Sequence, residues 1–161
     1  MTDSARIAVF ADVQNIYYTT RQAYGLSFDY RKCWQEISGR GRIVSATAYA
    51  IERNDSGQLK FQQALRHVGF SIKLKPYIQR SDGSAKGDWD VGITIDVLEA
   101  APKVDRIVLL SGDGDFDLLL ETVKSRHSVV TEVYGVPGLT ASSLVNVADH
   151  YHEIEHRLLQ G

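Results

Sequence analysis

The sequence predicts an α/β protein with three layers, in which helices cover both faces of a mainly parallel central sheet. Short apolar segments alternate along the chain with longer segments that have helical periodicity. Two of the apolar segments, 6–11 and 106–110, show no polar alternation, which is typical of strands buried on both faces. Strands that alternate with helices form right-handed βαβ crossovers, and these produce a parallel, Rossmann-like sheet.

The elements of the first half follow from stop signals and residue type. Each of three expected helices is directly followed by a glycine, a common helix stop. Residues 42–51 are rich in β-branched and small apolar residues, as strands are. Residues 71–78 alternate between apolar and polar side chains, and Pro76 indicates an edge strand. The expected order is helix 13–24, helix 29–38, strand 42–51, helix 55–68 and strand 71–78.

The second half begins with residues 79–87, whose Ser, Asp and Gly content predicts a loop. Pro102 ends the helix that follows, and apolar runs then alternate with amphipathic segments to the end of the chain. The expected order is helix 88–101, strand 106–110, helix 116–126, strand 129–134, helix 140–148 and strand 151–154.

Bulk properties indicate one ordinary globular unit. The length of 161 residues fits a single domain over 1–161, and 43% of the residues are hydrophobic. The net charge of −2 means that any basic surface for nucleic acid is local. One cysteine, Cys33, excludes an intramolecular disulfide and a multi-cysteine metal site. We see no signal peptide or membrane span, and we expect a cytoplasmic protein.

Five aspartates stand where a parallel sheet places its ligand site. Asp12 follows the first strand, Asp113 and Asp115 follow strand 106–110, and Asp88 and Asp90 begin a helix. In open α/β sheets the site lies beyond the carboxyl ends of the strands, where the strand order reverses. We therefore expect these acids to converge. Clustered carboxylates repel one another, and a hard divalent cation such as Mg²⁺ or Mn²⁺ relieves that repulsion.

Each acid also has a purely structural interpretation. Asp12 is a plausible helix N-cap, Asp88 and Asp90 suit a helix start, and Asp113 and Asp115 suit a glycine-rich turn. Independent capping needs would not bring three acidic segments to one sheet edge, so the joint interpretation is favoured.

Two further polar residues accompany these acids. Asn15 lies one helical turn after Asp12 and can face the same site without adding charge. Asp96 is a secondary candidate, either as a supporting group or as a buried, hydrogen-bonded acid.

Three motifs together resemble the NYN domain family, the LabA-like branch of the PIN-like ribonuclease superfamily. They are Asp12-Val-Gln-Asn15, Lys86-Gly-Asp-Trp-Asp-Val-Gly-Ile-Thr-Ile-Asp96 and Ser111-Gly-Asp-Gly-Asp-Phe116, and the resemblance spans about residues 6–155. It implies a PIN-like fold that cleaves RNA with a bound metal. One departure is Val13, where many relatives have glycine.

The resemblance also implies roles for individual residues. The catalytic metal ligands it implies are Asp12, Asp90, Asp113 and Asp115. Asp90 is preferred to Asp88 because relatives with a single acid carry it just before the valine of this motif. The implied substrate-binding residues are Asn15 and, as a minor partner, Ser111. Lys86 is a further candidate, from its position in the loop that leads to Asp90.

The RNA partner is expected to be single-stranded. Lys73, Lys75, Arg80 and Lys86 can form a local basic track, although lysines on an edge strand also prevent aggregation.

Aromatic residues on the first helix offer a second place for RNA. Tyr17, Arg21 and Tyr24 share one face of that helix, where they can stack on bases, pack in the core or form a dimer surface. A homo-oligomer is therefore left open.

Two other functions compete with the metal-dependent ribonuclease. The first is a catalytically inactive RNA-binding or regulatory module of the same fold. The second is a phosphatase or phosphotransfer domain with an aspartate nucleophile. Such phosphatases usually carry a second Asp two residues after the first, but this chain has Gln14 at that position, which argues against a phosphatase. A receiver domain has paired acids at the end of its first strand, but this chain has Ala11 beside Asp12, so the pair is absent.

Overall fold

The structure is a computed structural model that describes residues 4–52, 55–76, 78–79, 85–86 and 88–161. Its centre is a six-stranded sheet in which every strand pairs in parallel with its neighbour. The spatial order is β3-β2-β1-β6-β7-β8. These strands are β1 (Arg6–Asp12), β2 (Arg42–Glu52), β3 (Ser71–Pro76), β6 (Arg106–Leu110), β7 (Val130–Gly135) and β8 (His150–Glu153). The parallel α/β architecture is as predicted.

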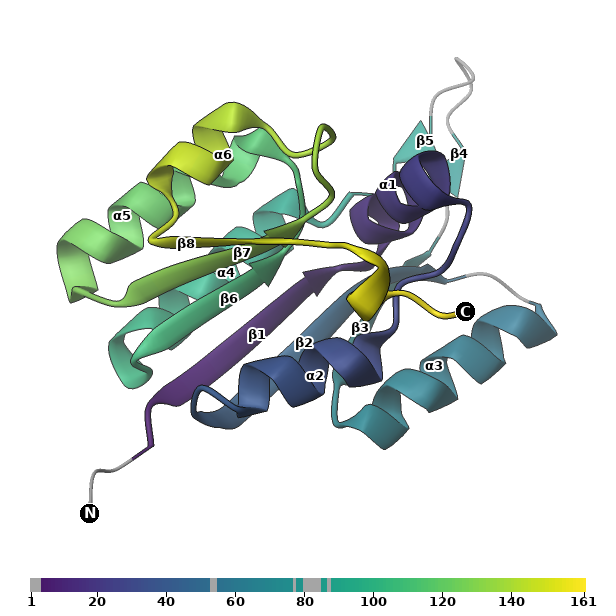
Figure 1. Ribbon diagram of the computed structural model, residues 1–161, viewed down its shortest axis with the longest axis horizontal. Coiled ribbons are helices and arrows are strands. Elements are labelled where there is room, and N and C mark those ends of the chain that lie inside the picture. Colours follow the sequence, from purple (N-terminus) through teal and green to yellow (C-terminus); the bar gives the residue numbers. More distant parts are fainter. Residues whose placement is uncertain (1–3, 53–54, 77, 80–84, 87) are drawn as a thin grey trace.

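Helices cover both faces of the sheet and complete the three layers (Figure 1). One layer holds α1 (Val13–Tyr24), α2 (Tyr30–Ser38) and α3 (Ser56–Val68). The other holds α4 (Asp90–Ala100), α5 (Asp117–His127) and α6 (Ser142–Val147). Three short 3₁₀ turns are η1 (Ala101–Lys103), η2 (Gly114–Phe116) and η3 (His156–Leu158).

The central strand β1 is buried on both faces, as its unbroken apolar sequence predicts. Ile7 and Val9 pack in the core with α1, α2 and α3, whereas Ala8 and Phe10 pack with α4, α5 and α6. All four side chains are at most 3% exposed. The apolar area removed from water on both faces is the main stabilisation of such a strand.

The order of the strands reverses at the pairing of β1 with β6. From β1 the chain builds the sheet outward through β2 and β3, and then returns to β6 on the other side of β1. The connections that leave β1 and β6 therefore run to opposite faces. The side chains just beyond these two strand ends are left facing a shared crevice.

The connection before α4 differs from the sequence prediction. Residues 79–87 are expected to be a loop, but β4 (Ile78–Gln79) and β5 (Ala85–Lys86) form an antiparallel pair. Residues 80–84 and 87 of this stretch lie outside the described residues, and residue type carries no signal for pairing between its two ends. The prediction that β3 lies at a sheet edge is confirmed, and this strand ends at Pro76.

Within the described residues, none of the helices is long and apolar enough to cross a membrane.

One charged group is buried in the sheet. Glu132 on β7 is 0% exposed, and its carboxylate accepts hydrogen bonds from Arg40 (2.6 Å) and Arg106 (2.8 Å) and contacts His152 Nε2 (2.7 Å). Burial alone would raise the pKa of this carboxyl, but the bonds from His152, Arg106 and Arg40 outweigh burial and lower the pKa to about 2. The network ties β7 to β6, to β8 and to the segment after α2.

We expect Glu132→Gln to destabilise the protein by about 3 to 5 kcal/mol at pH 7, because it leaves partly buried cations without their counter-charge. The Glu132 contribution is complete above pH 4.5 and is lost as the pH falls toward 2, since the folded pKa is the lower one. Urea unfolding measures both effects. Glu99→Gln on the exposed surface of α4 should change stability by less than about 0.5 kcal/mol. A loss at Glu132 as small as at Glu99 would contradict the role of the network.

Candidate metal centre

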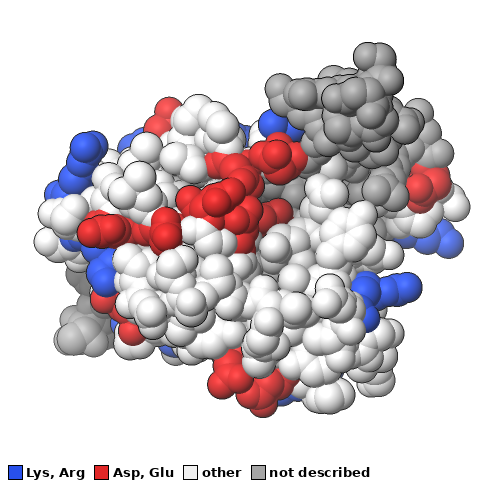
Figure 2. Space-filling view, turned by 90° about the horizontal axis from the view of Figure 1, so that it is seen from above, with Lys and Arg blue, Asp and Glu red and all other residues white. Residues whose placement is uncertain are grey.

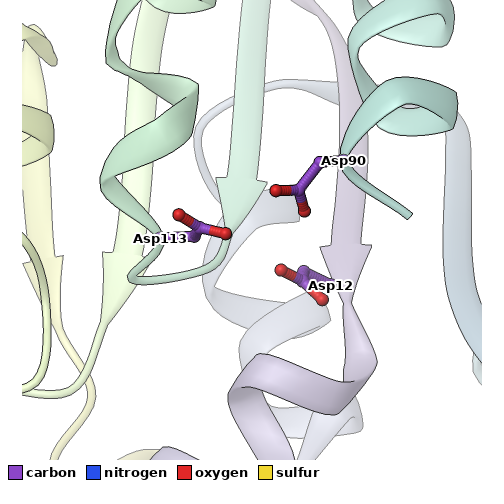
Figure 3. Close-up of side chains that lie close together, drawn as sticks. All are labelled: Asp12, Asp90 and Asp113. Carbon is purple, nitrogen blue, oxygen red and sulfur yellow. The ribbon is translucent and has the colours of Figure 1, made fainter. Parts of the chain in front are cut away.

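Three aspartates from distant parts of the chain meet at the crevice between β1 and β6. Asp12 ends β1, Asp113 follows β6, and Asp90 is the first residue of α4. One carboxylate oxygen from each lies within 4.8 Å of the other two. The three side chains point toward one another from three separate segments (Figure 3). The expected convergence of the acids is therefore found for these three.

Asp12 is the most constrained of the three. Its side chain is 9% exposed, and its Oδ2 accepts a 2.9 Å hydrogen bond from the hydroxyl of the fully buried Ser111. Its Oδ1 accepts from the backbone N–H of Asn15 at 3.5 Å and so caps α1. The structural and functional interpretations of Asp12 are compatible, because one carboxylate both caps the helix and lies in the cluster.

The loop after β6 positions Asp113. Its backbone N–H donates to Ser111 Oγ at 3.2 Å, and its Oδ1 accepts from the backbone N–H of Asp115 at 2.9 Å. The loop is fixed to α1 because Gly112 donates its N–H to Asn15 Oδ1 at 2.9 Å. A Cβ on Gly112 would lie 2.6 Å from the backbone oxygen of Leu139, so the close approach needs glycine.

The start of α4 positions Asp90. The backbone N–H of Asp90 donates to Asp88 Oδ1 at 3.2 Å. Lys75 of β3 donates from Nζ to the Asp88 carbonyl at 3.0 Å, and the same ammonium lies 4.6 Å from the centre of the Trp89 ring. The indole N–H of Trp89 donates to the Ala50 carbonyl at 2.9 Å. Side-chain contacts thus fix the first turn of α4 against the ends of β2 and β3.

The electrostatics of the cluster favour a bound cation. Burial, with smaller contributions from Asp113 and Asp88, raises the pKa of Asp12 to about 6 despite hydrogen bonds from Ser111 and Asn15. Burial and then the charges of Asp113, Asp88 and Asp12 raise the pKa of Asp90 to about 7. No ion pair among the described residues neutralises these acids. A divalent cation with oxygen ligands fits this donor set.

The other acids of the predicted site lie outside this group of three. Asp115 is exposed, and its backbone N–H supports Asp113. Asp88 is also exposed. Its charge contributes to the raised pKa of Asp90, and its carboxylate accepts the backbone N–H of Asp90 at the start of α4. Asp96 accepts hydrogen bonds from Tyr49 and from Lys73, both at 2.7 Å. Asp96 is therefore hydrogen-bonded but only half-buried, and the supporting role that the sequence favours for it stays a prediction.

The remaining predicted residues divide into two groups. Asn15 and Ser111 both contact the cluster through Asp12, as described above. The backbone of Lys86 belongs to β5, but its side chain lies outside the described residues, as does Arg80 of the proposed basic track. Lys73 and Lys75 do not form a free track, because both are engaged with α4 or the residues before it.

Sequence reasoning missed the residues that hold α4 in place. Tyr49 and Trp89 pack with ring centres 5.4 Å apart, and Tyr49 is the register partner of Asp12 on β2. Gly92 lies against the indole, where an added Cβ would be 2.6 Å from Trp89 Cε3. The sequence did offer one signal for this packing, namely Trp89 between Asp88 and Asp90, because a large aromatic side chain between two acids needs a packing partner.

The surface around the site is acidic. Acidic side chains gather in the middle of the face seen from above in Figure 2, while the lysines and arginines drawn there lie toward its margins. A bare surface of this kind repels phosphate, so a phosphate ligand requires a cation between the carboxylates and itself.

Comparison with known proteins identifies the family of this chain. A family model described as the NYN domain matches residues 6–155. The chain belongs to the NYN domain family. The low amplitude and bright protein LabA of Synechococcus elongatus is 30% identical to this NYN domain over 158 residues, which cover 93% of this chain and 84% of LabA. The resemblance seen in the three motifs is confirmed.

Solved structures confirm the fold. The crystal structure of a protein of unknown function from Vibrio parahaemolyticus superposes with a TM-score of 0.94 at 51% identity and covers 99% of both chains. Ribokinase from Giardia lamblia matches with a TM-score of 0.50 at 13% identity, over 92% of this chain and 57% of the ribokinase. The second match reflects the shared α/β fold alone.

We expect Gly92→Ala to destabilise the protein by about 1 to 3 kcal/mol, because the new methyl group displaces Trp89. Denaturant unfolding measures the change. Gly57→Ala is the matched control, because its added Cβ would meet no atom closer than 3.4 Å. The higher helix propensity of alanine should stabilise this variant by up to about 1 kcal/mol. Equal effects at the two glycines would contradict the packing argument.

Asp90→Asn should stabilise the metal-free protein at pH 8 by about 1 to 2 kcal/mol, since it removes a charge that partial burial and then repulsion from neighbouring acids both disfavour. In the wild type the raised folded pKa values of Asp12 and Asp90 make stability fall as the pH rises from about 4 to about 7. The advantage of the variant should therefore shrink at pH 5. Thermal unfolding in EDTA at both pH values measures the difference in stability between the variant and wild type. An Asp90→Asn variant that is less stable than wild type at pH 8 would show that the charge of Asp90 is not unfavourable in the metal-free protein.

Proposed function

We propose that this NYN domain is a metal-dependent endoribonuclease that cleaves single-stranded RNA. The observation that carries the proposal is the meeting of Asp12, Asp90 and Asp113 within 4.8 Å, with no counter-charge among the described residues. Membership of the NYN domain family supports RNA as the substrate. The alternative is an RNA-binding or regulatory module that retains the fold without activity.

The three carboxylates would hold Mg²⁺ or Mn²⁺, since both cations prefer oxygen ligands. When bound, such an ion lowers the pKa of a coordinated water and stabilises charge on a phosphodiester. The two hydrogen bonds to Asp12 keep its carboxylate oriented, so the ligand set is largely formed before metal binds.

Two neighbouring residues have roles toward the substrate in this proposal. The side-chain oxygen of Asn15 already accepts from Gly112, so its amide nitrogen is the group that remains to donate to a phosphate oxygen. Asp115 is exposed beside Asp113, where it can orient a water molecule without being a direct ligand. Lys86 is the proposed phosphate contact from the β5 segment.

We expect Asp12→Asn and Asp113→Asn each to reduce cleavage of a labelled single-stranded RNA in Mn²⁺ by about 100-fold or more, because each removes a ligand charge. Ser111→Ala should cost about 10-fold through misorientation of Asp12. Glu99→Gln, which neutralises an exposed acid near the other end of α4, is the matched control and should retain activity.

EDTA should abolish cleavage and excess Mn²⁺ should restore it. Equal cleavage by wild type and Asp113→Asn would show that a contaminating nuclease is responsible. RNA binding without any product, unaffected by EDTA and by Asp113→Asn, would instead support the inactive module.

A further inference from the structure

A cavity of about 420 Å³ opens beside the candidate metal centre. It lies between α1, the carboxyl end of β2 and the start of α3. Its wall is completed by Ser27 and Phe28 before α2, by Tyr30 at the start of α2, and by Gln160. Its volume falls within the range of about 300 to 1,000 Å³ that small-molecule sites occupy.

The lining of the cavity includes residues that are chain neighbours of the carboxylate cluster. Val13 and Gln14, which line the cavity, directly follow Asp12 in the chain. Ala50, also in the lining, directly follows Tyr49, the register partner of Asp12. A ligand group in the cavity is therefore next to whatever the cluster binds.

The chemistry of the lining suits a flat, neutral and polar group. Tyr17 and Tyr18 are half-exposed, at 50% and 52%, and three further aromatic residues of the lining are Phe28, Tyr30 and Phe61. No lysine, arginine or histidine is among the described residues that line it. Its one acid, Asp55, caps α3 by accepting the backbone N–H of Gln58 at 2.7 Å.

Three amide side chains in the lining supply hydrogen bonds that no described residue uses. They belong to Gln14, Gln58 and Gln160, and within the described part of the chain their side-chain oxygens and nitrogens have no partner. An amide offers a donor and an acceptor side by side, which matches the edge of a nucleobase. Aromatic faces together with free amides are how single-stranded RNA bases are commonly bound.

The surrounding charges also fit a nucleotide. The neutral cavity matches an uncharged base, while the adjoining carboxylates, with a cation, match its negative phosphate. The guanidinium of Arg21 lies 5.5 Å from the centre of the Tyr17 ring, so it is a positive charge next to one of the lining residues. Tyr24, in contrast, donates its hydroxyl to the Ile154 carbonyl and is structural.

We propose that this cavity binds one unpaired base of an RNA strand whose neighbouring phosphate lies at the Asp12–Asp90–Asp113 cluster. This deepens the proposed function and rests on it for the position of the phosphate. The base stacks on Tyr17 or Tyr18, and the glutamine amides contact its edge.

Fluorescence anisotropy with labelled RNA hexamers tests the proposal. Ca²⁺ replaces Mn²⁺, because it also takes oxygen ligands and can hold the phosphate at the cluster, and a gel confirms that the hexamer stays intact. An abasic nucleotide is placed at each position in turn, which removes the base and keeps the phosphate. For wild type, one abasic position should weaken binding about 10-fold. Tyr17→Ala should weaken binding of the intact hexamer by a similar factor and reduce the abasic penalty to less than about twofold.

Two variants act as companions. Gln58→Ala should reduce the abasic penalty in part, since it removes one contact to the base edge. Leu59→Ala is the matched control, because Leu59 is 58% exposed on the same helix and does not line the cavity, and it should bind like wild type.

The proposal is overturned if no abasic position weakens wild-type binding, or if Tyr17→Ala and Gln58→Ala retain the full penalty. Ribonucleoside monophosphates that bind as tightly as the hexamers would overturn the assignment to an RNA strand. Parallel cleavage in Mn²⁺ separates the two proposals. Cleavage without an abasic penalty refutes the base site alone, and an abasic penalty without cleavage refutes the nuclease alone.

Discussion

The parallel pairing of β1 with β6 is the constraint on which the rest of the molecule depends. Both strands are buried on both faces, so neither can shift without exposing the core. The reversal of strand order at this pair leaves the residues after each strand facing one crevice. The hydrogen bond from Ser111 to Asp12 spans that crevice and fixes the separation of the two loops. The cluster is therefore a consequence of the register of the sheet.

Most of the fold was predictable because its signals are local. Buried strands such as β1 show as unbroken apolar runs, and the glycines after α1, α2 and α3 mark where these helices end. The pairing of β4 with β5 was not predictable, because two-residue strands are too short to show a period. The pairing depends on how the ends of a longer connection meet in space.

The site was predictable to the level of its three acids and of Asn15 and Ser111, which contact Asp12. Asp12, Asp90 and Asp113 follow from strand ends and motif spacing. Asp115 is not one of the three clustered acids. It lies in the 3₁₀ turn η2, where sequence spacing does not determine the direction of a side chain. Lys75 of β3 holds the start of α4 through its contacts with Asp88 and Trp89, and these contacts join elements that are far apart in sequence. The tryptophan indicates that a packing partner exists, but a single sequence does not show which residue that partner is.

The Ser111–Asp12 contact also has a consequence in time. Its two residues are 99 positions apart, so the contact forms only after β6 has joined the sheet. Contacts of such high sequence separation form slowly, because the loop-closure entropy must be overcome first. A chain still emerging from the ribosome carries Asp12 long before Asp113 exists. The carboxylate cluster is thus assembled only after the chain has been extended past Asp113, and a shorter nascent chain lacks it.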